Sequence, residues 1–269
     1  MKNIIYQYWD GNVRPSCLAG VENMKRYAKR IGAEHVFEDN PGFLRKMGLN
    51  FGQYTPHYGA FKPIFEESFH EYDNVLFCDT DIFAVENLEE NIFEGFDHDI
   101  GICTEPFQPK QRTITLGRIT SHQDERWAKM VKNKWGVDVP RTEEGLVRVY
   151  NTGVVLYSNK GLKKCKDKFV PFQQYVDLVR HSNLNSFYQC DQPYLHAMMF
   201  VCNLDMIEMD NNWNSYIHMT HDKINPNKRI MDHRTPDTKF VHIQFAGADN
   251  LDGTTLERIA NLPQSEWKM

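Results

Sequence analysis

The first hydrophobic segments of the chain alternate between strand-like and helix-like patterns. A strand is predicted over residues 2–8, and the turn-forming residues Asp10-Gly11-Asn12 follow it. A helix is predicted to begin at Pro15 and to end before Gly32, because apolar side chains recur at helical spacing at Val21, Met24, Ala28 and Ile31. Residues 33–37 predict a second strand. This order is typical of a parallel sheet covered by helices.

A short, wholly apolar run over residues 75–78 predicts a strand that is buried on both faces of the sheet. A helix is predicted before it, over residues 57–72, with an apolar side formed by Ala60, Phe61, Ile64, Phe65 and Phe69. Asp79-Thr80-Asp81 follows the apolar run directly. Ligands of open α/β sheets bind at the carboxyl ends of the strands, so this tripeptide is a candidate site.

The rest of the chain continues the same pattern. Further strands are predicted over 99–104, 149–157, 204–209 and 239–243. Helices are predicted around Trp127 to Trp135, over about 161–180 with a disturbance at Pro171, and from Asp191 onward. Residues 106–148 are charged and contain three prolines, so they form either an insertion over the site or an ordinary surface excursion.

Composition limits the classes of function. The 269 residues are 41% hydrophobic and 25% charged, which is ordinary for a soluble globular protein. The formal net charge of -5 argues against a nucleic-acid-binding protein, which would normally present a basic face. No apolar run reaches the ~20 residues that span a bilayer, and the first residues are too polar for a signal peptide. We therefore expect a soluble, cytoplasmic protein of bacterial or viral origin, with no transmembrane segment and with its six cysteines reduced and buried.

Two aspartates separated by one residue at the end of a strand can face a single cation. Hard divalent ions such as Mn²⁺ or Mg²⁺ prefer oxygen ligands and readily bridge substrate phosphates. The alternative is a solvated turn, but two carboxylates at the edge of a core strand are costly unless a cation meets them. Asp79 and Asp81 are therefore candidate metal ligands.

Residues 71–83 resemble the metal-binding segment of GT-A-fold glycosyltransferases, and are closest to the glycogenin-like and galactosyltransferase-like group called family 8. Later segments extend the resemblance in the same order. These segments are Tyr150-Asn151-Thr152-Gly153-Val154, Cys190-Asp191-Gln192-Pro193, Asn212-Trp213-Asn214 and Phe240-Val241-His242-Ile243. Together the matching segments span roughly residues 2–248.

This resemblance implies a fold, a reaction and a set of site residues. The fold would be a single GT-A-like, Rossmann-like α/β domain with a mixed, mainly parallel sheet flanked by helices. The reaction would transfer a sugar, as a hexosyl or pentosyl group, from a nucleotide diphosphate to a hydroxyl of a glycan acceptor. A UDP-sugar is the favoured donor, and a GDP-sugar is the alternative. The metal, Mn²⁺ or Mg²⁺, would be held by Asp79, Asp81 and His242.

The same resemblance assigns roles to further residues. Lys62, Thr80, Asn151, Gly153 and Gly247 would bind the donor, and Asp191 and Gln192 would lie beside the reacting carbon. Residues 1–105 would form the nucleotide-binding half, 106–148 an insertion or lid, 149–248 the acceptor and catalytic half, and 249–269 a C-terminal tail.

The nucleotide would lie against the end of the first strand, beside Tyr8, Trp9 and Asp10. Aromatic rings suit stacking against a base, although Tyr8 and Trp9 could equally be core residues. Asp10 suits a ribose hydroxyl, because a carboxylate at a strand end needs a partner.

One part of the chain departs from the family pattern. The family usually has His-x-x-Gly followed closely by a lysine for the diphosphate, whereas Gly247 comes late after His242 and Asp249 stands where the lysine is expected.

The stereochemical outcome stays open between two mechanisms. The resemblance implies retention, in which the leaving phosphate takes the acceptor proton, whereas an inverting enzyme would use Asp191 as the general base.

Two other functions remain open. Haloacid-dehalogenase-type phosphatases also place Asp-x-Asp after a strand and bind Mg²⁺, and Asp249 and Asp252 could supply their late acidic pair. In those enzymes, however, the motif normally closes the first strand. The other alternative is a non-catalytic protein that binds a sugar nucleotide, although such a protein would have no need of the whole set of candidate residues together.

Overall fold

The computed structural model describes residues 1–105, 119–219, 230–245 and 247–267. Within these residues, the main sheet contains β1 (Asn3–Trp9), β2 (Glu34–Asp39), β3 (Asn74–Cys78), β5 (Ile100–Thr104), β6 (Tyr150–Ser158) and β7 (Met206–Glu208). The strand order is β2-β1-β3-β6-β5-β7. Strand β6 runs antiparallel to β3 and β5, and the other neighbouring pairs are parallel. The predicted mixed, mainly parallel sheet is confirmed.

A second, smaller sheet lies beside the carboxyl end of β3. It contains β4 (Ile82–Ala84), β8 (Ser215–Met219), β9 (Ile230–Asp232) and β10 (Phe240–Gln244), in the order β4-β10-β8-β9. The sequence predicted β10 but not the other three strands. In this sheet His242 of β10 is the register partner of Ile82, which directly follows Asp79-Thr80-Asp81.

Side chains of the main sheet alternate between two hydrophobic cores, as the two-residue period of a strand requires. On β3, Val75 and Phe77 join one core, whereas Leu76 and Cys78 join the other. Both faces are therefore buried, as the apolar run over 75–78 predicted. All six cysteines are free and buried.

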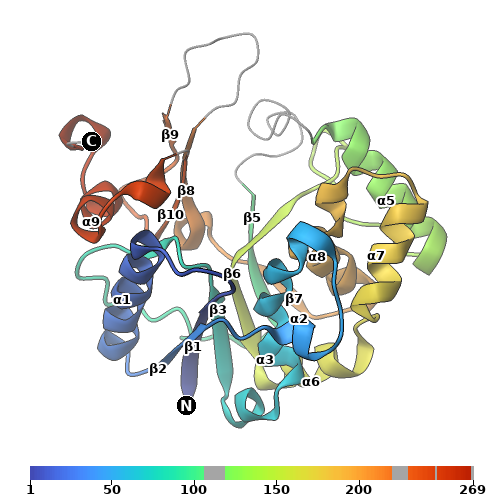
Figure 1. Ribbon diagram of the computed structural model, residues 1–269, viewed down its shortest axis with the longest axis horizontal. Coiled ribbons are helices and arrows are strands. Elements are labelled where there is room, and N and C mark those ends of the chain that lie inside the picture. The colour runs from blue at the N-terminus through green and yellow to red at the C-terminus, as the bar shows by residue number, and fades with distance from the viewer. Residues whose placement is uncertain (106–118, 220–229, 246, 268–269) are drawn as a thin grey trace.

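Helices cover both faces of the main sheet (Figure 1). On one side lie α1 (Pro15–Arg30) and α9 (Gly253–Asn261), and on the other lie α2 (Phe43–Lys46), α3 (Lys62–Phe65), α5 (Ser121–Trp135), α6 (Asn159–Lys168), α7 (Phe172–His181) and α8 (Asp191–Val201). None of the helices in the described ranges is long and apolar enough to cross a membrane.

Two predicted helices are interrupted in the structure. The segment over 57–72 consists of a 3-10 helix (Pro56–Phe61), the short α3, and a second 3-10 helix (Glu67–Glu71). One cause is a close approach, because a Cβ on Gly59 would lie 2.3 Å from the ring of Tyr8. The second interruption, between α6 and α7, ends at Pro171, which cannot continue a helix.

The regions predicted as an insertion and as a C-terminal tail both contribute side chains to the cores. Helix α5, from the predicted insertion, buries Trp127 and Val131 in the larger core. Residues 106–118 of that insertion, where a lid was expected, lie outside the described residues. The segment predicted as a C-terminal tail forms α9, which buries Leu256 and Ile259 against β10. Helix α9 has only nine residues, so its apolar positions are too few for a helical period to be recognised in the sequence.

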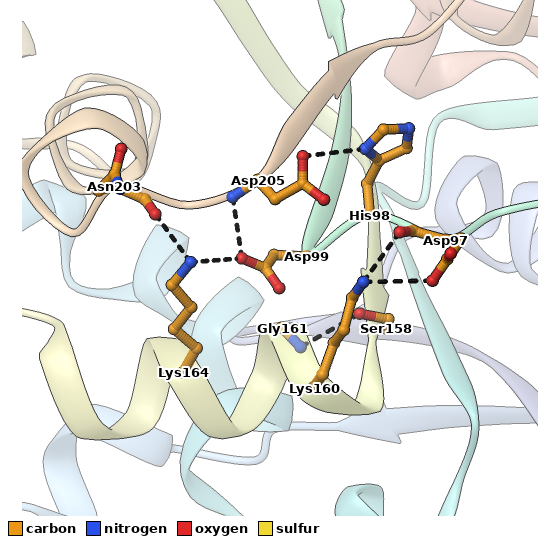
Figure 2. A network of polar contacts seen from close by, with 9 residues as sticks. All are labelled: Asp97, His98, Asp99, Ser158, Lys160, Gly161, Lys164, Asn203 and Asp205. Atoms are coloured by element: carbon orange, nitrogen blue, oxygen red, sulfur yellow. Dashed lines mark hydrogen bonds and ion pairs between the residues drawn. The ribbon is translucent and has the colours of Figure 1, made fainter.

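A polar network fastens α6 to the start of β5 (Figure 2). The Lys164 ammonium group lies 2.7 Å from Asp99 Oδ2, and the same oxygen accepts from the Asp205 N–H at 2.8 Å. Lys160 pairs with Asp97 one turn earlier. The lysine-rich face of α6 is thus used in part to hold the helix against the sheet.

We predict that Gly161→Ala destabilises the protein. Helix propensity alone would favour alanine by about 1 kcal/mol, but a Cβ at this position would lie 1.8 Å from the Asp99 carbonyl oxygen. Helix α6 would have to move away from β5, so the free energy of unfolding should fall by at least about 1–3 kcal/mol in a denaturant titration. Lys163→Ala, at an exposed position on the same helix, is the control and should change it by less than about 0.5 kcal/mol. A stabilised Gly161→Ala variant would contradict the packing described here.

Candidate functional site

A cavity of about 420 Å³ opens at the carboxyl ends of β1 and β3. Its walls come from the end of β1, the N-terminus of α1, the loop after β3, the end of β10 and the segment before α9. The lining residues are Tyr8, Trp9, Asp10, Ser16, Cys17, Pro56, His57, Asp79, Thr80, Asp81, Phe83, Ile243, Gln244, Ala248, Asp249 and Leu256. The cavity therefore lies where open α/β sheets bind ligands.

Asp79, Asp81 and His242 converge at one side of this cavity. Each offers a ligand atom, and the three atoms lie within 4.8 Å of one another. The turn between the aspartates is closed by the Ile82 N–H, which donates to the Asp79 carbonyl at 3.3 Å. The pairing of β4 with β10 then brings His242 Nε2 to 3.2 Å from Asp81 Oδ1.

The charges of these three residues perturb one another. Burial and the neighbouring Asp81 carboxylate together raise the pKa of Asp79 to about 8, although His242 opposes the shift. Burial disfavours a charged His242, but Asp81, Asp79 and Glu105 outweigh this effect and raise the His242 pKa. Both shifts show that the folded protein binds protons tightly at this position, as expected where negative charge lacks a permanent counter-ion.

Two aspartates at the rim of the cavity, Asp10 and Asp249, form ion pairs with arginines. Asp10 pairs with Arg45, and Asp249 pairs with Arg14. Among the described residues, neither lysine nor arginine lies within ion-pair distance of the inner residues Asp79 and Asp81.

The inner group fits a divalent cation. His242 Nε2 is buried, and no group in the described part of the chain forms a hydrogen bond of good geometry with it. Two carboxylates and one imidazole nitrogen, together with open cavity space for a ligand's oxygens, form a donor set that suits Mn²⁺ or Mg²⁺.

Strand β6 and helix α8 bring further predicted residues to the same region. The Asp79 N–H donates to the Gly153 carbonyl at 2.8 Å, which ties the end of β3 to β6. A Cβ on Gly153 would lie 2.7 Å from His242 Cε1, so this position requires glycine. Asn151 Nδ2 donates to Gln192 Oε1 at 3.4 Å.

Asp191 is the first residue of α8, where the helix dipole favours a negative charge. It is buried, and its carboxylate accepts a hydrogen bond from the Thr152 hydroxyl at 2.7 Å. His57, which lines the cavity, lies 3.6 Å from its other oxygen. Asp191 therefore lies beside His57, a residue of the cavity wall, without being part of the lining itself.

The three residues at the end of β1 all line the cavity, as predicted. The Tyr8 hydroxyl donates to the Pro56 carbonyl at 2.8 Å, and the Trp9 indole N–H donates to the Asn12 carbonyl at 2.9 Å. Both rings are held by protein contacts and still present surface to the cavity. Their predicted contact with a nucleotide stays a prediction.

Lys62 and Gly247, like Asn151 and Gly153, lie outside the cavity lining. The Lys62 ammonium group pairs with Glu38 and with Glu66, so β2 and α3 supply its counter-ions. Gly247 has a positive φ of 99° and precedes the 3-10 turn that contains Ala248 and Asp249. Neither arrangement tests a contact with a donor.

Sequence reasoning missed several residues of the site. His57 was predicted only as part of a helix. Glu105 directly follows β5, and its buried carboxylate accepts from Gln192 Nε2 at 2.5 Å. Asn214 contacts His242. The one available signal was position, since Glu105 directly follows a predicted strand just as Asp79 does.

No family model matches the chain, and no curated protein sequence matches it significantly. Solved structures do match. One is a glycosyltransferase involved in the glycosylation of the major capsid of PBCV-1, at 15% identity and a TM-score of 0.50, covering 90% of this chain and 92% of that chain. Another is the galactosyltransferase LgtC in complex with donor and acceptor sugar analogs, at 14% identity and a TM-score of 0.50, covering 98% and 99%. An active-site mutant of LgtC matches at 14% identity and a TM-score of 0.51, with the same coverage.

These likenesses show the fold. The chain has the GT-A-like α/β fold of these glycosyltransferases, extending over nearly its whole length. The predicted fold class and the suspected resemblance are confirmed at this level.

We predict that Asp79→Asn changes how stability depends on pH in metal-free protein. A carboxyl group whose pKa is raised on folding stabilises the folded state at low pH, and this contribution is lost as pH rises toward 8. The wild-type protein should therefore lose up to about 1.4 kcal/mol per pH unit from this group between pH 5 and 8. The variant lacks the loss and should be more stable than wild type at pH 8, as measured by calorimetry in a chelator. Asp97→Asn, with a side chain that is 96% exposed, is the control. If Asp79→Asn showed the same pH dependence as wild type, the described burial of Asp79 would be wrong.

Proposed function

We propose that the protein is a metal-dependent glycosyltransferase that transfers a hexosyl or pentosyl group from a nucleotide-diphosphate sugar to a glycan hydroxyl. The observation that carries the proposal is the group of Asp79, Asp81 and His242 at the end of β3, beside a cavity of about 420 Å³ that both aspartates line. The GT-A-like fold supports it, because this fold places such a group beside a nucleotide site in the glycosyltransferases that the chain resembles.

In this proposal the metal is held by Asp79, Asp81 and His242. A bound Mn²⁺ or Mg²⁺ would supply Lewis-acid stabilisation of the negative charge that develops on the leaving diphosphate. The charges around the cavity support a metal at this position. The rim aspartates Asp10 and Asp249 have arginine partners, whereas Asp79 and Asp81 have no lysine or arginine partner among the described residues.

The base and ribose would bind at the end of β1. Trp9 and Tyr8 line the cavity, and both rings are already fixed by hydrogen bonds, so little conformational entropy would be lost on contact with a base. Asp10 would meet a ribose hydroxyl. A UDP-sugar is the donor we favour, and a GDP-sugar is the alternative.

The donor sugar would lie between Gly153 and the start of α8. Asp191 and Gln192 would stabilise the positive charge that develops at the reacting carbon, as carboxylates do in glycoside hydrolysis. Asp191 is held in place by Thr152, which keeps its carboxylate fixed during charge development. We propose retention of configuration, with the acceptor proton taken by the leaving phosphate. Inversion with Asp191 as general base is the alternative outcome.

The phosphatase alternative has less support from the structure. Its late acidic pair would be Asp249 and Asp252. Asp249 pairs with Arg14, and Asp252 caps α9 by accepting from the Thr255 N–H at 2.8 Å. Neither carboxylate is among the metal-binding group of the described residues.

We predict that Asp81→Ala loses binding of both metal and donor. A ligand at 100 times its Kd stabilises the native state by about 2.7 kcal/mol, which corresponds to a rise in Tm of roughly 5–10 °C. Wild-type protein should show such a rise with one UDP-sugar or GDP-sugar in Mn²⁺, but not in a chelator. For Asp81→Ala the donor affinity should fall by more than about 100-fold. Asp138→Ala, which removes an exposed carboxylate paired with Lys132, is the control. Tight, metal-dependent donor binding by Asp81→Ala would overturn the proposal.

We also predict that Asp191→Asn abolishes transfer while donor binding survives. The amide is isosteric and its oxygen can still accept from Thr152, so the fold should persist, but the negative charge near the reacting carbon is lost. Turnover should fall by about 100-fold or more with an unchanged donor Kd. Asp177→Asn, on the exposed side of α7, should retain activity. Near-normal turnover of Asp191→Asn would remove this residue from the mechanism, and NMR of the product anomer from wild type would separate retention from inversion.

A further inference from the structure

A chain of buried side-chain hydrogen bonds begins at one backbone group, the N–H of Gly153. This N–H donates to Asn151 Oδ1 at 2.7 Å, and Asn214 Nδ2 donates to the same oxygen at 2.9 Å. The other end of the Asn214 amide, Oδ1, lies 3.1 Å from His242 Nδ1. Asn151 is 8% exposed, Asn214 2% and His242 1%, so these contacts are shielded from water.

The orientation of both amides follows from the backbone donor. An N–H can only donate, so the Asn151 atom that faces Gly153 must be its carbonyl oxygen. The Asn214 atom that meets this oxygen must then be a donor, which is its NH₂ group. The remaining Asn214 atom is therefore the oxygen, and it is this oxygen that faces His242.

This orientation fixes the tautomer of His242. An oxygen acceptor 3.1 Å from Nδ1 requires that Nδ1 carry the proton. The nitrogen left to bind a cation is therefore Nε2, which lies 3.2 Å from Asp81 Oδ1. In metal-free protein that carboxylate can accept from a protonated Nε2, so both ring nitrogens then face acceptors. The ring plane is also held, because His242 packs against Tyr216 with ring centroids 4.3 Å apart.

A neutral ring without a cation cannot satisfy both of its acceptors. An unprotonated Nδ1 would face the Asn214 oxygen, and an unprotonated Nε2 would face the Asp81 carboxylate. A cation at Nε2 would remove this conflict, because Nδ1 would keep its proton for Asn214 while Nε2 and Asp81 both served as ligands. The hydrogen bond to Asn214 should therefore favour the metal-bound form.

The same backbone anchor orients the catalytic amide on the other side. Because Asn151 Oδ1 faces Gly153, Asn151 Nδ2 faces Gln192 and meets its Oε1 at 3.4 Å. Gln192 Nε2 is then left to donate to Glu105 Oε2 at 2.5 Å. One N–H thus sets the direction of side chains that reach both the metal group and the reacting centre.

We propose that Asn214 is a positioning residue which, through Asn151 and the Gly153 N–H, fixes His242 in the Nδ1–H tautomer and so presents Nε2 as the metal-binding nitrogen. The proposal rests on the proposed function, because the proton on Nδ1 matters where a cation binds at Nε2. Partners of this kind orient ligating histidines in metal sites generally, and their loss typically lowers metal affinity by about 10–100-fold.

The test compares wild type with Asn214→Leu, which keeps the volume of the side chain and removes both polar ends. The first measurement is ¹⁵N NMR of the histidine rings during titration with Mg²⁺, which is diamagnetic. Comparison with His242→Gln identifies the signal. At saturation the wild type should show a protonated Nδ1 and an Nε2 without a proton, and Asn214→Leu should need about 10–100-fold more Mg²⁺ to reach that state.

The second measurement is Mn²⁺ affinity by calorimetry, which should fall by about 10–100-fold in Asn214→Leu. Asn23→Leu is the matched control. Asn23 is also buried, and its side chain also makes two hydrogen bonds, to the N–H and the carbonyl of Ala84, but it does not contact His242. This control should lose stability to a similar extent and keep the wild-type Mn²⁺ affinity and tautomer.

Two results would overturn the inference. One is a protonated Nε2 in wild type saturated with Mg²⁺, or an Asn214→Leu variant that reaches the wild-type state at the same Mg²⁺ concentration. The other is an equal loss of Mn²⁺ affinity in both leucine variants, which would show general destabilisation. Failure of the proposed function would look different, because the wild-type protein would then bind neither Mn²⁺ nor Mg²⁺.

Discussion

Two carboxylates held together at the end of a core strand are the constraint on which the rest of the site depends. Asp79 and Asp81 repel each other, and burial together with this repulsion raises the Asp79 pKa to about 8. The fold tolerates this arrangement because β10 delivers His242 to the same point, and Gly153 leaves room for its ring. A proton or a divalent cation can relieve the remaining negative charge, and a cavity that admits phosphate oxygens favours the cation.

Much of this arrangement could be predicted from sequence because it is encoded locally. The run over 75–78 is wholly apolar, which predicted a central strand with the next residues at the carboxyl end of the sheet. In the structure its side chains do alternate between two cores. Asn151 and His242 lie within strands that the pattern also identified, and Asp191 begins a helix with proline in its first turn. Strand ends and helix starts were sufficient to place these residues in one region.

The features that sequence did not predict depend on tertiary contacts. The helix expected over 57–72 is interrupted in part because Gly59 packs against the Tyr8 ring from another strand. Strands β4 and β9 have three residues each, too few for a two-residue period to be recognised. Lys62 was predicted to bind the donor, and the sequence did not indicate that Glu38 of β2 forms an ion pair with it. Local patterns carry no information about such partners.

The charges at the rim of the cavity affect which groups would stabilise the leaving diphosphate in the proposed reaction. The resemblance expects a lysine where Asp249 stands, and this aspartate forms an ion pair with Arg14 at the start of α1. The pair has no net charge, whereas a lysine would add one positive charge beside the diphosphate. The proposed mechanism must therefore take a larger share of leaving-group stabilisation from the metal group. The orientation of His242 therefore matters for the proposed reaction, because a ligand in the wrong orientation would lower the affinity for the cation on which the reaction relies most.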